Sequence, residues 1–282
     1  MTNIKLYFNT VIFGICMFFT LSCFASSRIN FGIITALHSE AVPIISRMNH
    51  VETKTISHIH YYSGNIDHKK VVLIVGGVGS INAAIATTEL IREFNPHYVI
   101  FSGSAGGVNK DLNIGDVVIS KQAYLVDFGN PTSIKPTIQL PELDPIRNEA
   151  VPLIFYGSKI LLKAAYNIAK LPLPAHDIKN KEKKAKIISG KIATSEYFPD
   201  SEIDIKRIEK NNVAALEMEG AAVLKACWIF NKPDCLVVRG ISDLVQPPIN
   251  SKYVQWNTKN QTIANENAAS VTIGIIKTIK KT

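Results

Sequence analysis

Carboxylates and other reactive side chains follow several of the apolar, strand-like runs in this sequence. An Asp or Glu in such a place can give or take a proton, and a nearby Arg or Ser can orient the reacting group. In open sheets of alternating strands and helices, ligands bind beyond the carboxyl ends of the strands. The residues at or shortly beyond the ends of predicted strands are therefore candidates for one site: Glu40, Ser104, Glu217, Glu219, Arg239 and Asp243.

The segments Ala215–Ala222 (ALEMEGAA) and Val237–Asp243 (VVRGISD) carry the most specific signal. Both place acidic residues in an apolar passage, and burying a carboxylate is costly unless it has a partner or a chemical task. Taken alone, Asp243 could be a helix cap or a member of a surface salt bridge, and Glu40 could be a helix-start acid that the helix dipole favours.

Two glycine-rich segments, Gly76–Gly79 and Gly103–Gly107, would let the backbone approach a ligand closely. The first is not a dinucleotide fingerprint, because the run from Gly77 to Asn82 lacks the last glycine of that motif. A tight turn between strand and helix explains it at least as well.

Short apolar runs alternate with stretches of helical period, which is typical of a sheet covered by helices. The predicted strands are Ile29–Thr35, His58–Gly64, Val71–Gly76, Tyr98–Ser102, Val117–Val126, Ile187–Ala193, Val213–Leu216 and Asp234–Ile241. The predicted helices are one capped by Ser39 and those over Ser80–Phe94, Ser158–Ala169, Gly220–Phe230 and Thr262–Ile279. The stretches Gly129–Pro152 and Leu244–Trp256 are predicted to be irregular.

The composition favours one globular domain. With 282 residues, 46% of them hydrophobic, the chain can form one substantial core. The net charge of +8 comes from Lys and Arg spread along the chain without interleaved aromatics, which argues against nucleic-acid binding. The lysines between Lys179 and Lys186 are interpreted as a solvated loop or strand approach.

The N-terminus has the pattern of a secretory signal. Lys5 precedes the apolar run Val11–Leu21, and a small residue, Ala25, stands at the expected cleavage position. The apolar run is too short for a membrane-spanning helix. We expect residues 1–25 to be removed and the single domain, 28–282, to be exported to the periplasm or secreted; a lipid anchor on Cys23 is the alternative.

Export would leave Cys227 and Cys235 as the remaining cysteines. An exported protein can form a disulfide, but both residues lie in apolar contexts where small buried thiols are common. We therefore predict two separate core thiols. The sequence has no CxxC or other zinc spacing, and His58 and His60 lack a nearby third ligand, so no metal site is predicted.

The two acidic segments resemble the signature of the purine nucleoside phosphorylase superfamily, and especially its 5′-methylthioadenosine/S-adenosylhomocysteine nucleosidase branch. The resemblance extends through Gly32–Glu40 (GIITALHSE), Gly103–Gly107 (GSAGG) and Ile114–Val118 (IGDVV), in matching order. It implies a single-domain, three-layer α/β/α fold with a mixed central sheet flanked by helices. It also implies cleavage of the bond between a purine and its ribose, with no cofactor.

The resemblance implies a role for each matching residue. Asp243 would be the acid that protonates purine N7, and its pKa must then lie well above the ordinary value of about 3.9. Glu40 would activate the attacking water, with Ser104 and Arg239 as its partners. Glu219 would accept from the ribose hydroxyls. The remaining substrate-binding residues would be Met218 against the sugar, Phe198 stacked on the base, Glu217, Leu37, Ala105 and Gly106.

Hydrolysis is predicted rather than transfer to phosphate. A phosphorylase gathers arginines around the phosphate, whereas this chain has Thr35–Leu37 and Phe101–Ser102 where bacterial phosphorylases carry Arg-containing motifs, and Glu40 would repel the anion. A phosphorylase and a non-catalytic nucleoside-binding protein are the alternatives. Pro199 offers no N–H to the base edge, which leaves the preferred purine open. The resemblance further implies a homodimer.

Overall fold

The computed structural model describes residues 29–56, 58–127, 151–177, 179–197, 202–245 and 258–280. The predicted signal segment 1–25 lies outside these ranges. So do residues 129–150 of the first predicted irregular stretch and residues 246–256 of the second.

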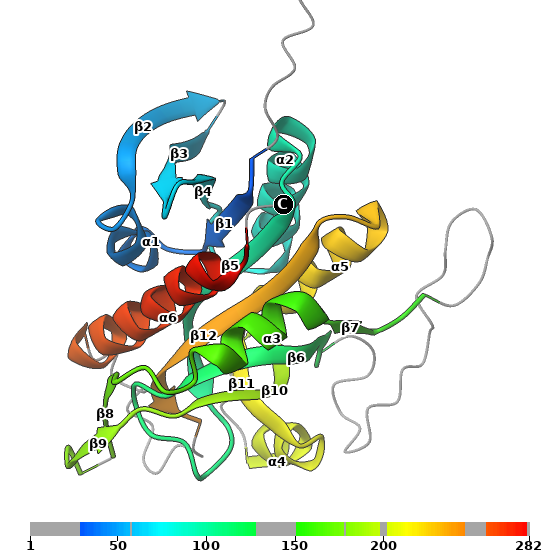
Figure 1. Cartoon of the computed structure of the whole chain (residues 1–282). Helices are drawn as coiled ribbons and strands as arrows, with labels where there is room; N and C mark the ends of the chain where they lie inside the picture. The colour runs from blue at the N-terminus through cyan, green and yellow to red at the C-terminus, as the bar shows by residue number, and fades with distance from the viewer. Residues whose placement is uncertain are drawn as a thin grey trace, which may run out of the picture.

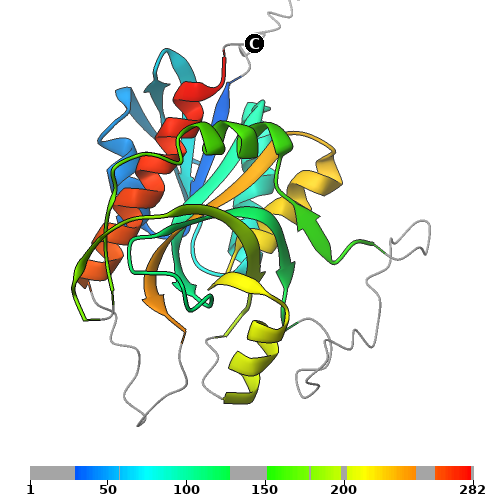
Figure 2. The same ribbon diagram turned by 60° about the horizontal axis from the view of Figure 1, so that its bottom comes forward.

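A ten-stranded mixed sheet forms the centre of the molecule, in the order β11-β10-β6-β12-β5-β1-β4-β3-β2, with β7 paired to β6 (Figure 1). β4, β1, β5 and β12 run parallel, and β6 is antiparallel to β12. β11 also pairs with β5, so one half of the sheet curls into a closed ring, which Figure 2 shows from below. The strands of the sheet are β1 (Phe31–Thr35), β2 (Asn49–Ile56), β3 (Ile59–Ile66), β4 (Lys69–Val75), β5 (Tyr98–Gly107), β6 (Val117–Leu125), β7 (Ile154–Tyr156), β10 (Ile187–Thr194), β11 (Val213–Glu217) and β12 (Asp234–Leu244).

Helices cover both faces of this sheet, and each face has its own apolar core. Successive strand residues point to opposite faces, so Ile34 and Phe101 pack with α2 and α5, whereas Ile33 and Ile100 pack with α1, α3 and α6. The helices are α1 (His38–Ile45), α2 (Ser80–Phe94), α3 (Lys159–Asn167), α4 (Glu202–Lys210), α5 (Gly220–Phe230) and α6 (Thr258–Thr278). The predicted three-layer α/β/α fold is confirmed.

Elements with a strong apolar pattern were predicted well, and polar ones were missed. α2 and α5 have the predicted bounds. β2 was not predicted because it is an edge strand whose side chains are almost all exposed, which leaves no alternating apolar signal. The lysine-rich run contributes to a small hairpin of β8 (Pro174–His176) and β9 (Glu182–Lys184).

The prediction of separate thiols was wrong, because Cys227 and Cys235 form a disulfide. Both residues are buried, as their apolar contexts indicated. The last turn of α5 is joined to the start of β12 by a short connection, which brings the two Cα atoms to 6.4 Å, within the range of a bridge. Only the packing of the helix on the strand could reveal this proximity.

Reducing this disulfide is expected to destabilise the protein by about 2.5 kcal/mol, because a bridge across eight residues restricts the unfolded chain. Urea unfolding of the protein lacking residues 1–25, with and without a thiol reductant, measures the effect. The double variant Cys227→Ala/Cys235→Ala is the control and should not respond to the reductant. An identical unfolding midpoint for the oxidised and reduced wild type would contradict the prediction.

Candidate active site

The predicted site residues come together at the carboxyl ends of β1, β5, β11 and β12. β5 lies between β1 and β12 in the parallel part of the sheet, and β11 reaches the same place by pairing with the end of β5. The sheet therefore gathers segments that are as far apart in the chain as Glu40 and Asp243 into one cluster of polar side chains.

Glu40 lies in the first turn of α1 and is buried. Its Oε2 accepts from the backbone N–H groups of Ala36 and Leu37, at 2.9 and 3.0 Å. Its Oε1 accepts from the N–H and hydroxyl of Ser104, at 2.8 and 3.1 Å. The helix N-cap is Leu37, so the prediction of a Ser39 cap was wrong, and the capping carboxylate belongs to Glu40.

Arg239 is the central cation of the cluster and is only 1% exposed. Its Nη2 donates to Oε2 of Glu217 and, at 3.0 Å, to Oε2 of Glu219. Burial alone would lower the pKa of the guanidinium, but Glu217, Glu219 and Glu40 together raise it above its ordinary value. Arg239 is therefore a permanent positive charge that compensates the buried carboxylates.

Gly103 makes the close approach of Arg239 and Glu40 possible. A Cβ atom at this position would lie 2.4 Å from Nη1 of Arg239 and 2.5 Å from Oε1 of Glu40, which no side chain could tolerate. This glycine in the GSAGG segment is therefore required by packing within the site.

Glu217 has protein donors on both of its oxygens. Oε1 accepts from the hydroxyl of Thr194, and Oε2 accepts from Arg239 and from the N–H of Gly220, at 2.7 Å, in the first turn of α5. These contacts are those of a residue that holds Arg239 and the start of α5 in place. Nothing in the sequence pointed to Thr194.

Glu219 stands at the N-cap of α5, where its Oε1 accepts from the N–H of Gly79 at 2.8 Å. Burial raises the pKa of this carboxyl to about 7, with Glu217 and Glu40 adding to the shift and Arg239 and the Gly79 N–H opposing it. The adjacent Met218 is half-buried, and its carbonyl accepts from the Ser80 hydroxyl at 3.4 Å.

The raised pKa of Glu219 predicts a pH-dependent stability. A carboxyl that binds its proton more tightly when folded stabilises the folded state below its unfolded pKa, near 4.5, and this contribution is lost as the pH rises through about 7. The free energy of unfolding of wild type relative to Glu219→Gln should therefore fall by up to about 3 kcal/mol between pH 4.5 and pH 8. Denaturant unfolding of both proteins across this range measures it; a pH-independent difference would contradict the prediction.

Asp243 lies at the end of β12, beyond an irregularity in the pairing with β5 that places it opposite Gly106. Its Oδ1 accepts from the Ser242 hydroxyl at 2.7 Å. Burial raises the pKa of the Asp243 carboxyl, although the Ser242 hydrogen bond opposes the shift. A Cβ at Gly106 would lie 3.2 Å from Oδ2, so the carboxyl packs against the GSAGG backbone. A carboxyl in this setting can be a proton donor.

The other residues predicted to bind substrate make few contacts with the cluster around Arg239. Leu37 is half-buried and contributes its N–H to Glu40, and the carbonyl of Ala105 accepts from Ser242 at 3.4 Å. Phe198 and Pro199 lie outside the described residues.

In the part of the chain that the structure describes, no group of three or more His, Cys, Asp or Glu side chains could hold a metal ion. His60 instead contacts the Thr55 hydroxyl at 2.9 Å.

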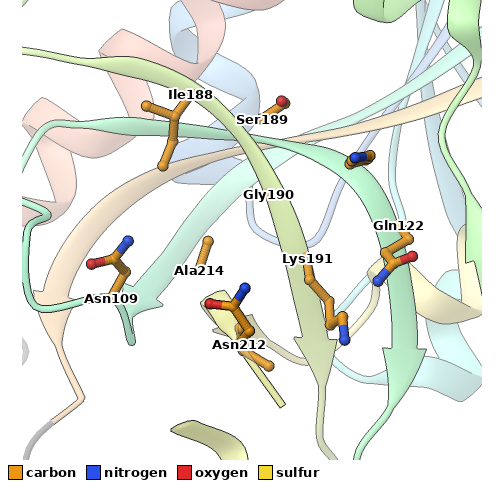
Figure 3. Close-up of a pocket in the computed structure, with 10 residues that line it drawn as sticks. Asn109, Gln122, Ile188, Ser189, Gly190, Lys191, Asn212 and Ala214 are labelled. Atoms are coloured by element: carbon orange, nitrogen blue, oxygen red, sulfur yellow. The ribbon is translucent and has the colours of Figure 1, made fainter. Parts of the chain in front are cut away.

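A separate polar cavity of about 380 Å³ lies over β6, β10 and the start of β11 (Figure 3). None of the predicted site residues within the described ranges lines it. Its lining residues are Asn109, Lys121, Gln122, Ile188, Ser189, Gly190, Lys191, Asn212, Val213 and Ala214.

Comparisons with known proteins agree with this geometry. The model of the Phosphorylase superfamily matches residues 30–277. The 5′-methylthioadenosine/S-adenosylhomocysteine nucleosidase of Psychromonas ingrahamii is 33% identical over 232 residues, which are 80% of this chain and 90% of that protein. The nucleosidase of the same name from Staphylococcus aureus is 31% identical over 76% of this chain and 86% of its own.

Solved structures give the same result. The crystal structure of 5′-methylthioadenosine/S-adenosylhomocysteine nucleosidase from Neisseria meningitidis, in complex with methylthio-immucillin-A, superposes with a TM-score of 0.74 at 27% identity. The superposition covers 89% of this chain and 99% of that one.

Proposed function

Because the chain belongs to the phosphorylase superfamily and is a purine nucleosidase, we propose that it hydrolyses 5′-thio-substituted adenosines and that the buried cluster around Arg239 is its active site. The observation that carries this proposal is the convergence of Glu40, Ser104, Glu219 and Arg239, with Asp243 beside them, at one edge of the sheet. The relatives named for methylthioadenosine and S-adenosylhomocysteine support this substrate class.

Asp243 supplies the proton that the leaving purine needs. Cleavage of the N-riboside bond leaves negative charge on the base, which N7 relieves by accepting a proton. Burial raises the pKa of Asp243, so its protonated form persists closer to neutral pH than that of an ordinary aspartate. The proton moves from the carboxyl oxygen to N7 as the bond to the sugar breaks.

Glu40 and Glu219 act on the sugar side. Glu40 takes a proton from the water that attacks the anomeric carbon, and the Ser104 N–H and hydroxyl orient its carboxylate. Glu219 accepts from the ribose hydroxyls, while Arg239 and the Gly79 N–H hold its carboxylate. The products are the free base and the free sugar.

The charge of the site supports water rather than phosphate as the nucleophile. Among the arginines whose side chains the structure describes, Arg239 is the one at the site, and Glu217 and Glu219 already occupy its Nη2. A phosphate would meet three carboxylates, those of Glu40, Glu217 and Glu219, with that single guanidinium for compensation.

An assay of base release across a panel of purine nucleosides, with and without phosphate, tests the proposal. The panel contains adenosine, inosine, methylthioadenosine and S-adenosylhomocysteine. We expect phosphate-independent release of adenine, fastest from the two thioethers. Release that requires phosphate and forms ribose 1-phosphate would identify a phosphorylase, and no release from any nucleoside would identify a binding protein.

We also propose that the protein is exported with residues 1–25 removed. The basic start, short apolar run and Ala25 support this, and so does the disulfide, because such bridges persist mainly in oxidising compartments. No helix in the described part of the chain is long and apolar enough to cross a membrane. Mass spectrometry of the mature N-terminus tests the proposal, and an intact Met1 would contradict it.

A homodimer is the proposed assembly. Val78, just before α2, is 43% exposed, and Ile81 and Ile85 in its first turns are 75% and 52% exposed and lie on one helix face. Gly79, between them in the chain, donates to Glu219, so this apolar surface adjoins the site. Sedimentation velocity at micromolar concentration tests the assembly, and a monomer would contradict it.

A further inference from the structure

The N-terminus of α2 has no cap of its own. Its N-cap is Gly79, which has no side chain, and its first turn contains no acidic residue. Helix N-termini leave several backbone N–H groups without intrahelical partners. Two carboxylates from distant parts of the chain accept from neighbouring N–H groups here: Glu219 from Gly79 at 2.8 Å, and Glu196 from Ser80 at 3.0 Å.

The two carboxylates that accept from the Gly79 and Ser80 N–H groups lie in different surroundings. Glu219 is buried within the cluster around Arg239, whereas Glu196 is exposed. Gly79 has a φ of +94°, and a Cβ there would lie 3.2 Å from Oε2 of Glu196. The Glu196 carboxylate therefore packs closely against the Gly79 backbone as well as accepting from Ser80.

Glu196 is itself firmly held. Its own N–H donates to Oδ2 of Asp127 at 2.6 Å, and the neighbouring Ser195 hydroxyl donates to the same oxygen at 3.2 Å. The Ser195 N–H donates to the carbonyl of Glu217 at 2.9 Å. These contacts tie the segment carrying Glu196 to the end of β6 and to β11, so its carboxylate is fixed relative to the site.

We propose that Glu196 is a positioning residue for sugar binding: it holds the first turn of α2 so that the Gly79 N–H keeps the Glu219 carboxylate aimed at the ribose hydroxyls. This inference rests on the proposed role of Glu219. Without Glu196, the Ser80 N–H loses its acceptor, so the preceding Gly79 N–H is less firmly placed as the donor to Oε1 of Glu219. Because Glu196 is exposed, removing it leaves no uncompensated buried charge, and the fold should persist.

Equilibrium binding in an Asp243→Asn background tests this, because bound nucleoside should then be turned over about a thousandfold more slowly. Calorimetry with adenosine and with 2′,3′-dideoxyadenosine separates the contribution of the hydroxyls. Glu196→Ala should weaken adenosine binding about tenfold and leave dideoxyadenosine binding within twofold. Glu196→Gln, which keeps an acceptor oxygen, should restore most of the loss. Asp177→Ala is the control: a partly exposed carboxylate that also accepts from backbone N–H groups but lies in the β8–β9 hairpin.

A double-mutant cycle of Glu196 and Glu219 measures whether the two residues act through the same contact, which a general loss of stability would not produce. In the Glu219→Gln background, Glu196→Ala should have little further effect on adenosine binding, because both changes act on one contact. Additive losses, an equal loss for both nucleosides, or a change below twofold would overturn the inference.

Wild-type base release is measured alongside. If the wild type hydrolyses nucleosides but Glu196→Ala weakens adenosine and dideoxyadenosine binding equally, only this inference is overturned. If Glu196→Ala weakens adenosine binding selectively but the wild type releases no base, only the proposed function is overturned.

Discussion

Asp243→Asn is expected to lower the rate of base release about a thousandfold, the usual contribution of a positioned general acid. The amide has the same shape and can still hydrogen-bond to the purine, but it cannot transfer a proton to N7. Nucleoside binding should therefore change only a few-fold while kcat collapses. Steady-state release of adenine from methylthioadenosine, together with calorimetric binding, measures both quantities.

Asp234→Asn is the matched control for this variant. Asp234 begins the same strand, β12, at the end remote from the site, and its side chain is exposed. This change should leave kcat within twofold. If Asp243→Asn retained more than a tenth of the wild-type rate, a different group would have to protonate the base, or the chemical step would not limit turnover.

Glu40→Gln is expected to reduce base release by a similar factor, on the order of a thousandfold, through loss of the base that activates water. The structure adds a second consequence. All four groups that contact Glu40 are donors: the N–H groups of Ala36, Leu37 and Ser104, and the Ser104 hydroxyl. A Gln amide would point its own N–H₂ at one pair of donors, so the variant should also unfold more easily, by about 1–2 kcal/mol.

Single-turnover kinetics and urea unfolding together separate these two effects. Glu266→Gln is the control, because Glu266 is an exposed carboxylate of α6 that pairs with Arg47 away from the site. A Glu40→Gln protein that hydrolyses at a rate close to wild type would show that water is activated elsewhere. A variant that releases base only when phosphate is added would favour the phosphorylase alternative.

The position of each catalytic candidate along the chain could be predicted because each one differs in residue type from its immediate neighbours. Glu219 and Asp243 stand out as acids among apolar residues, and Gly103–Gly107 as a backbone that can approach other groups closely. The apolar periodicity of α2 and α5 likewise determined their bounds. These signals depend only on neighbours within a few residues.

What the sequence could not indicate depends on contacts between distant segments. The pairing of Cys227 with Cys235 needs the docking of α5 on β12, and the Glu196 contact with Ser80 joins residues 116 positions apart. The same is true of Thr194 on Glu217 and of the three carboxylates around Arg239.

The sequence by itself therefore determined the fold class, the strand ends and the residue types of the site. The tertiary structure alone decided how these two neighbouring carboxylates differ. Glu217 and Glu219 are alike in type and only two positions apart, yet Glu217 accepts from Thr194, Gly220 and Arg239, whereas Glu219 accepts from Gly79 and Arg239. Burial raises the pKa of Glu219 to about 7. The difference arises because desolvation and hydrogen-bond geometry are properties of the packed molecule, not of the local chain.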